Sequence, residues 1–285
     1  MKRILLPLLA LLLMSSDSFL PWKNITHCES PSPISLFASL ADFKSFRDIH
    51  PLPEKVDYKE EGKMISFRAS DGKNAAAYFV KAEKSAAKKY LFVFHEWWGL
   101  NDYIKQESDK WAEMLPGVHV IALDLYDGKV ATTREDAGNY MQNTKEERAK
   151  AIIEGALKFA GPEAEIATIG WCFGGGWSLQ SGLLAGKQTV GCVVYYGMPE
   201  KSVAKLKKLN SDVLGIFASE DEWINAEVVS DFEKNMKKAG KEVTTKTFNG
   251  VHGFANPSNP KYNESAAEEA EKMSYKYLKD KFQIS

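Results

Sequence analysis

A cysteine stands at a point in the sequence where a strand, a glycine-rich turn and a helix are expected to meet. Cys172 has glycines two positions before and after it, Gly170 and Gly174, with an apolar segment at 166–169 and a helical pattern at 177–184. This is the nucleophile-elbow spacing G-x-S-x-G with cysteine in place of serine. The glycines suit a reversal too sharp for larger side chains, and a helix N-terminus behind the sulfur favours its thiolate.

The elbow pattern also has a structural interpretation. Most cysteines are small buried hydrophobes, and glycine-rich turns also serve packing and phosphate binding, so the spacing alone leaves the role of Cys172 open. A catalytic role requires an acid and a base elsewhere in the chain, in the order nucleophile, acid, histidine.

Two further strand ends carry residues of the required types. Asp221 follows a predicted strand at 213–217, and His252 follows another at 243–248, in a loop bounded by glycines. An imidazole at His252 would take the thiol proton, and a carboxylate at Asp221 would fix its tautomer and stabilise the imidazolium. Three suitable residues in this order favour a triad in which Cys172 is the nucleophile.

Each of these assignments has competitors. His252 is compatible with a turn histidine and Asp221 with a helix cap, while Glu220 and Glu222 compete with Asp221 as the acid. Three other histidines fit the base poorly, because two lie in the N-terminal region and one lies inside a predicted strand: His27, His50 and His119.

The loop after the predicted strand at 90–94 holds a second group of candidates. Such a loop commonly supplies an oxyanion-hole N–H, so we assign one donor to Trp97 and its companion to Phe173, the residue after the nucleophile. Two fixed donors would each lower the barrier by roughly 3–4 kcal/mol. Glu96 in the same loop is a candidate acceptor of the Cys172 proton, and a surface carboxylate is its alternative.

The elements that must position these residues follow an α/β pattern. Continuous apolar strands alternate with amphipathic helices from about residue 63 onward, which predicts a mostly parallel sheet of about eight strands with helices on both faces. A hairpin at 64–80 adds an antiparallel edge. The 285 residues carry a net charge of −1, which supports neither nucleic acid nor an anionic membrane as a partner.

The start of the chain is typical of a signal peptide at 1–18. Lys2 and Arg3 precede an apolar run at 4–14 that is too short to span a bilayer comfortably. We expect an exported protein, periplasmic or secreted, and an uncleaved membrane anchor is the alternative. After signal removal we expect no stable membrane partner and a monomer.

The predicted domain spans 61–285, and an extension or linker precedes it at 19–60. Within the extension, apolar residues at helical spacing predict a short amphipathic helix at 34–46. Docking of its apolar stripe on the main domain is the interpretation that we favour.

The domain resembles the dienelactone hydrolase family, within the α/β-hydrolase fold. Four segments carry the resemblance: His-Glu-Trp-Trp-Gly-Leu-Asn at 95–101, Asp-Leu-Tyr at 124–126, Gly-Trp-Cys-Phe-Gly-Gly at 170–175 and His-Gly-Phe at 252–254. The resemblance implies a triad of Cys172, Asp221 and His252, and a thiol proton that passes to Glu96 when substrate binds. It implies attack on a small ester or lactone, an acyl-thioester intermediate and its hydrolysis, and it implies no metal or organic cofactor.

The chain departs from the family where specificity is set. The best-known members bind the substrate carboxylate with two arginines; one would lie where this chain has Asn256, and Arg134 is a candidate for the other. Because tryptophans flank the proposed site, we also predict an aromatic-walled substrate pocket. The predicted substrate-binding residues are Trp98, Trp223, Tyr126 and Arg134.

Three alternative functions stay open at this point. A thioesterase or carboxylesterase for another small substrate is the nearest of them. A thiol redox protein using Cys172 would lack a C-x-x-C motif, and a binding domain without catalysis is compatible with the same scaffold.

Overall fold

We describe the protein from a computed structural model, which covers residues 31–53, 57–83 and 88–284. The predicted signal peptide at 1–18 and the first part of the predicted extension lie outside the described residues. The chain divides into two compact units, 1–31 and 32–285, and every element named below belongs to the second. Within the described ranges, no helix combines the length and the apolar character needed to cross a bilayer.

One eight-stranded sheet forms the centre of the molecule, as predicted. The spatial order is β1-β2-β4-β3-β5-β6-β7-β8. β1 pairs with β2 and β2 with β4 in antiparallel fashion, and all other pairs are parallel. The strands are β1 (Lys63–Arg68), β2 (Asn74–Val80), β3 (Lys89–Phe94), β4 (His119–Leu123), β5 (Glu165–Trp171), β6 (Thr189–Tyr195), β7 (Val213–Ala218) and β8 (Val243–Phe248).

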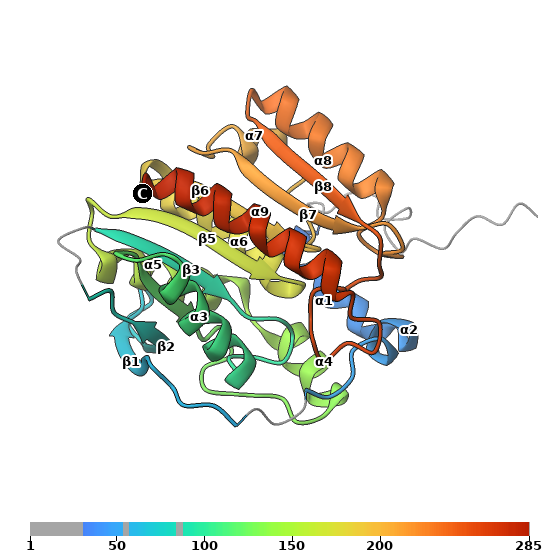
Figure 1. The fold of residues 1–285 in the computed structure, drawn as a ribbon, viewed down its shortest axis with the longest axis horizontal. Coiled ribbons are helices and arrows are strands. Elements are labelled where there is room, and N and C mark those ends of the chain that lie inside the picture. Colours follow the sequence, from blue (N-terminus) through green and yellow to red (C-terminus); the bar gives the residue numbers. More distant parts are fainter. Residues whose placement is uncertain (1–30, 54–56, 84–87, 285) are drawn as a thin grey trace, which may run out of the picture. The chain divides into compact units, whose positions relative to one another are not determined.

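Helices cover both faces of this sheet (Figure 1). α3 (Asp102–Met114) and α9 (Glu264–Phe282) lie on one face, and α5 (Glu146–Ala160) and α6 (Phe173–Ala185) lie on the other. The central strands are buried on both sides because helices pack on each face, which explains their continuous apolar sequences. Three further helices complete the domain: α4 (Arg134–Asn143), α7 (Val203–Leu206) and α8 (Ala226–Ala239).

Residues 32–50, here called the N-terminal segment, pack against this domain. The single helix predicted at 34–46 is instead divided into α1 (Pro33–Ala38), the 3₁₀ helix η1 (Ser39–Asp42) and α2 (Lys44–Asp48). Phe43 is extended between the last two, with φ −85° and ψ 125°. Because of this break, apolar side chains from all three short helices face the domain. The buried ones are Ile34, Phe37, Ala38, Leu40, Ala41 and Phe46.

Candidate active site

Cys172 occupies a sharp turn between β5 and α6, as the elbow pattern predicts. Its backbone has φ 58° and ψ −120°, a conformation that side chains other than glycine seldom adopt. A Cβ on Gly170 would lie 2.1 Å from the carbonyl oxygen of Gly174, and a Cβ on Gly174 would lie 2.3 Å from that of Phe94. Both glycines are therefore required by close backbone approach, and the turn presents the sulfur at the carboxyl end of the sheet.

Asp221 and His252 meet at the same end of the sheet, from the loops after β7 and β8. Asp221 Oδ2 accepts a hydrogen bond of 2.7 Å from His252 Nδ1, and both side chains are fully buried. The other oxygen, Oδ1, accepts the N–H groups of Trp223 and Ile224 at 2.9 and 2.8 Å. Asp221 therefore caps the turn and holds the histidine at once. Its competitors Glu220 and Glu222 are exposed.

These contacts set the charge and tautomer of the pair. Burial alone would raise the pKa of Asp221, but His252 and the backbone N–H groups of Ile224 and Trp223 hold this pKa below its usual value. The carboxylate is therefore ionised and accepts the Nδ1 proton of His252. The remaining nitrogen, Nε2, is buried and has no hydrogen-bond partner among the described residues, so its lone pair is available.

The Cys172 thiol is buried beside two backbone donors. Burial raises its pKa well above the usual value, and the Glu96 carboxyl raises it further. The backbone N–H groups of Phe173 and Trp97 act in the opposite direction by hydrogen bonding to the sulfur. The structure thus brings the backbone N–H groups of both residues predicted as oxyanion donors to Cys172 Sγ, and burial favours the neutral thiol there.

His50 is the residue that our sequence analysis missed. Dismissed as part of the extension, it lies with its Nε2 atom 3.8 Å from Cys172 Sγ. Its Nδ1 atom donates to the carbonyl oxygen of Phe46 at 2.6 Å, and burial lowers its pKa to about 3. The neutral ring therefore turns an unprotonated Nε2 toward the thiol.

Aromatic packing holds the N-terminal segment over the site. The Phe46 ring lies 5.6 Å from Trp97, 5.1 Å from Trp223 and 5.8 Å from His252, measured between ring centroids. The His50 ring lies 4.4 Å from Phe46. The chain's own side chains therefore fill the space above Cys172 and His252, and Cys172 has no exposed surface.

Glu96 lies in the loop after β3 and is also buried. Burial raises its pKa to about 7, although His252 and a hydrogen bond from Asn256 lower it. Asn256 Nδ2 donates to Glu96 Oε2 at 2.5 Å. The neighbouring His95 orders this loop, since its Nδ1 contacts the carbonyl oxygen of Glu96 at 2.6 Å and its Nε2 accepts the N–H of Leu125.

The four predicted substrate-binding residues take different positions. Trp98 is buried edge-on against Trp97, and Trp223 is half-buried against Phe46 and His252. Tyr126 is buried between the rings of His95 and Phe173. Arg134, at the start of α4, donates from Nε to the backbone carbonyl of His50 at 2.8 Å, so it holds the N-terminal segment.

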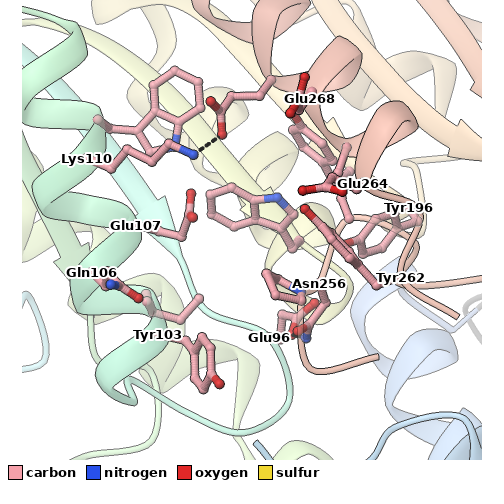
Figure 2. Close-up of a pocket in the computed structure, with 18 of the residues that line it drawn as sticks. Glu96, Tyr103, Gln106, Glu107, Lys110, Tyr196, Asn256, Tyr262, Glu264 and Glu268 are labelled. Atoms are coloured by element: carbon pink, nitrogen blue, oxygen red, sulfur yellow. Dashed lines mark hydrogen bonds and ion pairs between the residues drawn. The ribbon is translucent and has the colours of Figure 1, made fainter. Parts of the chain in front are cut away.

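A cavity of about 910 Å³ lies between α3 and α9 and reaches the site at Glu96 and Tyr196. Figure 2 shows Glu107 and Lys110 of α3 opposite Glu264 and Glu268 of α9 across this space. Tyr196 links the cavity to His252, because the centroids of the two rings lie 5.1 Å apart.

Solved structures share this arrangement of sheet and helices. The structure of m3DLH matches with a TM-score of 0.66 and 21% identity, covering 77% of this chain and 98% of that one. A dienelactone hydrolase-like promiscuous phosphotriesterase from metagenomic libraries matches with a TM-score of 0.64 and 20% identity, again over 77% and 98%. The protein has the α/β-hydrolase fold.

Sequence comparison defines the family more closely. The profile of the dienelactone hydrolase family matches residues 75–282, and the chain belongs to that family. It is 30% identical to Protein usf of Aquifex pyrophilus over 207 residues, covering 67% of this chain and 87% of that protein. A protein of Aquifex aeolicus provisionally named carboxymethylenebutenolidase is 28% identical, covering 68% and 87%. The chain is thus a hydrolase of carboxylic esters or lactones, as predicted.

Proposed function

We propose that the protein hydrolyses small esters or lactones through a triad of Cys172, His252 and Asp221. The observation that carries this proposal is the buried Asp221–His252 hydrogen bond. It leaves His252 Nε2 beside the elbow cysteine without a hydrogen-bond partner among the described residues. Because the resting thiol is neutral, a base must remove its proton when substrate binds. His252 is suited to this task since the ionised Asp221 stabilises the resulting imidazolium.

The reaction follows from this arrangement in two stages. His252 Nε2 takes the Cys172 proton, and the thiolate attacks the carbonyl carbon to form a C–S bond. The N–H groups of Trp97 and Phe173 hold the tetrahedral oxyanion. Its collapse breaks the C–O bond, and His252 returns the proton to the leaving alkoxide. Water, deprotonated by His252, then attacks the thioester, which releases the acid and restores the thiol.

Glu96 assists this cycle as a second proton acceptor near the sulfur. A pKa near 7 lets its carboxylate share the thiol proton at neutral pH, when a substrate carbonyl displaces the sulfur from its resting position. Asn256 supports this role because it keeps one Glu96 oxygen hydrogen-bonded without the positive charge of an arginine, which would hold the carboxylate ionised.

The cavity between α3 and α9 indicates the charge of the substrate. Six carboxyl groups line it against two lysines, Lys110 and Lys272, and each lysine is already paired with a glutamate of α9. Asn256 also replaces the family arginine that would bind a substrate carboxylate. An anionic substrate would meet repulsion here, so we propose neutral or cationic esters and lactones rather than dienelactone itself.

A matched pair of substrates tests both parts of this proposal. The butyrate esters of 4-hydroxybenzamide and 4-hydroxybenzoate differ mainly in the charge of the leaving group, and small neutral lactones complete the panel. We expect the neutral ester to have a kcat/KM at least about tenfold higher at low salt, with a smaller difference at high salt as charges are screened. Equal values for the two esters would contradict the substrate class.

Two cysteine variants test the nucleophile with the same panel. Cys172→Ala should reduce hydrolysis by at least about 10³-fold because no covalent intermediate can form. Cys192→Ala is the matched control, since Cys192 is also buried but lies within β6, away from the elbow. Undiminished hydrolysis by Cys172→Ala would remove the proposed mechanism.

Export is a separate proposal that depends on residues 1–18. The basic start and short apolar run support a cleaved signal peptide. Fractionation of expressing cells and N-terminal sequencing of the mature chain test it, and a cytosolic chain that retains residues 1–18 would contradict it.

A further inference from the structure

Three buried side chains from distant parts of the chain converge at the elbow. The nitrogen and sulfur atoms of His50, Cys172 and His252 all lie within 4.8 Å of one another, and none of the three residues is more than 5% exposed. One sulfur and two imidazoles form a donor set that Zn²⁺ accepts in proteins, whereas Mg²⁺ and Ca²⁺ prefer oxygen.

Both histidines are oriented as metal ligands are. Each donates its Nδ1 proton to a fixed acceptor, Asp221 Oδ2 at 2.7 Å for His252 and the Phe46 carbonyl oxygen at 2.6 Å for His50. Such outer contacts set the tautomer and ring orientation of histidines that bind metals. The unprotonated Nε2 atoms remain. The one on His252 is buried and has no hydrogen-bond partner within the described part of the chain, and the one on His50 faces Cys172 Sγ.

The surroundings of the Cys172 sulfur also suit a metal-bound thiolate. The backbone N–H groups of Phe173 and Trp97 hydrogen-bond to Cys172 Sγ, and such donors stabilise a coordinated thiolate. A Cys172 thiolate and the Asp221 carboxylate together balance the two positive charges of a divalent ion, so the buried charges would be paired.

We propose that His50 Nε2, Cys172 Sγ and His252 Nε2 bind one Zn²⁺ ion, with water in the fourth position. The thiol releases its proton to solvent as the Zn–S bond forms, and both imidazoles bind in their neutral form. Bond lengths of about 2.3 Å to sulfur and 2.0 Å to nitrogen place tetrahedral ligands roughly 3.3–3.5 Å apart. The 3.8 Å between His50 Nε2 and Cys172 Sγ is close to this spacing.

Metal binding has two consequences for the protein. It fastens the N-terminal segment to the elbow, because His50 supplies one ligand and the domain supplies the other two. It also withdraws the sulfur and the His252 lone pair from the chemistry given above, so Zn²⁺ inhibits hydrolysis; this second consequence rests on the proposed function.

Cobalt titration of the mature chain, after treatment with a chelator, tests the site directly. Co²⁺ reports its ligands optically, since a thiolate produces a near-ultraviolet charge-transfer band and a tetrahedral site produces intense visible bands. We expect both, saturating at one Co²⁺ per chain and lost on addition of Zn²⁺. Absence of the charge-transfer band from the wild type would overturn the proposal.

Variants assign the ligands. Cys172→Ala should lose the charge-transfer band, and His50→Asn should weaken Co²⁺ binding by at least about tenfold, as loss of a ligand costs no less than loss of an outer contact. His119→Asn is the matched control because His119 is also buried but is the first residue of β4, whereas the site lies at the carboxyl ends of the strands. This variant should bind Co²⁺ like the wild type. Identical titrations of His50→Asn and wild type would contradict the three-residue site.

Inhibition is measured separately, as the ratio of ester hydrolysis without and with Zn²⁺ for each variant. We expect Zn²⁺ to suppress hydrolysis by the wild type at far lower concentration than by His50→Asn. A chain that binds Co²⁺ through sulfur yet hydrolyses no ester keeps the metal site and loses the proposed function. A chain that hydrolyses esters without a Co²⁺ band keeps the function and loses the metal site.

Discussion

The two sides of Cys172 are built in different ways. On one side, Asp221 and His252 stand on loops at the ends of β7 and β8, so the hydrogen-bond register of the parallel strands fixes their positions. On the other side, His50 is carried by short helical turns that are anchored by packing of single aromatic side chains. Sheet register resists local change, whereas a segment held by a few side chains can open without unfolding the domain.

The largest effect of any substitution is expected on the side of Cys172 that is built on the sheet. Asp221→Asn should lower kcat by about 10³–10⁴-fold, because the amide no longer stabilises the correct tautomer and the imidazolium of His252. Glu220→Gln and Glu222→Gln, the exposed neighbours, should each stay within about twofold of the wild type. Ester kinetics at fixed pH measure all three. A loss at Glu220 or Glu222 comparable with that at Asp221 would mean that another acid serves the triad.

On the segment side, the largest effect is expected at Phe46. This ring is fully buried, so Phe46→Ala should cost about 3–4 kcal/mol of packing. We expect the cost to appear as opening of the N-terminal segment, measured as faster alkylation of Cys172 by iodoacetamide in the presence of EDTA. Phe43→Ala is the control, since Phe43 belongs to the same segment and is 38% exposed. Equal alkylation rates in both variants would show that Phe46 does not hold the segment.

Glu96, in the loop after β3, should make the free energy of unfolding depend on pH. Burial raises its pKa from 4.5 to about 7, so the folded chain keeps a proton that the unfolded chain releases. This stabilisation is fully present below pH 4.5 and is lost as the pH rises through 7. Glu96→Gln, which stays neutral, should therefore match the wild type near pH 4.5 and exceed its unfolding free energy by on the order of 3 kcal/mol at pH 8. Urea unfolding with EDTA measures this difference, and Glu222→Gln should show none.

The smallest effect is expected at Arg134. Its hydrogen bond to the His50 carbonyl should contribute about 1 kcal/mol, so Arg134→Met should speed Cys172 alkylation by about fivefold. Arg134→Lys, which keeps the charge and one donor group, should fall between the two. An unchanged rate in Arg134→Met would mean that aromatic packing alone retains the segment.

The strands could be predicted from sequence, and the residues of the proposed triad could be located, because their signals are local. A buried parallel strand requires an unbroken apolar run, and a catalytic loop follows it directly, so Cys172, Asp221 and His252 each lie within a few residues of a recognisable strand end. The same logic identified Trp97 and Phe173 as neighbours of the sulfur. Our sequence analysis favoured Asp221 over Glu220 and Glu222, and the structure adds the burial that separates the three, since Asp221 is buried and its two neighbours are exposed.

Docking of the N-terminal segment on the domain was predicted and is confirmed, but the place of His50 beside Cys172 was beyond this reasoning. His50 is 122 residues from Cys172 in the chain. Its position depends on where Phe46 packs, and no sequence motif predicts that packing. The break of the predicted helix at Phe43 has the same origin. Tertiary contacts with the domain outweighed the helical periodicity of the sequence and divided the helix into shorter pieces. Arg134 was proposed as a carboxylate ligand on family grounds, yet its guanidinium contacts the backbone carbonyl of His50, the residue that was missed.

The backbone angles of Cys172 carry an evolutionary cost. A residue with a Cβ at φ 58° strains the chain by roughly 1–3 kcal/mol, and glycine would not. Replacing Cys172 by glycine would therefore relieve this backbone strain, but it would also remove the thiol. Under the proposed function, position 172 keeps its cysteine only while selection for catalysis outweighs selection for a more stable fold.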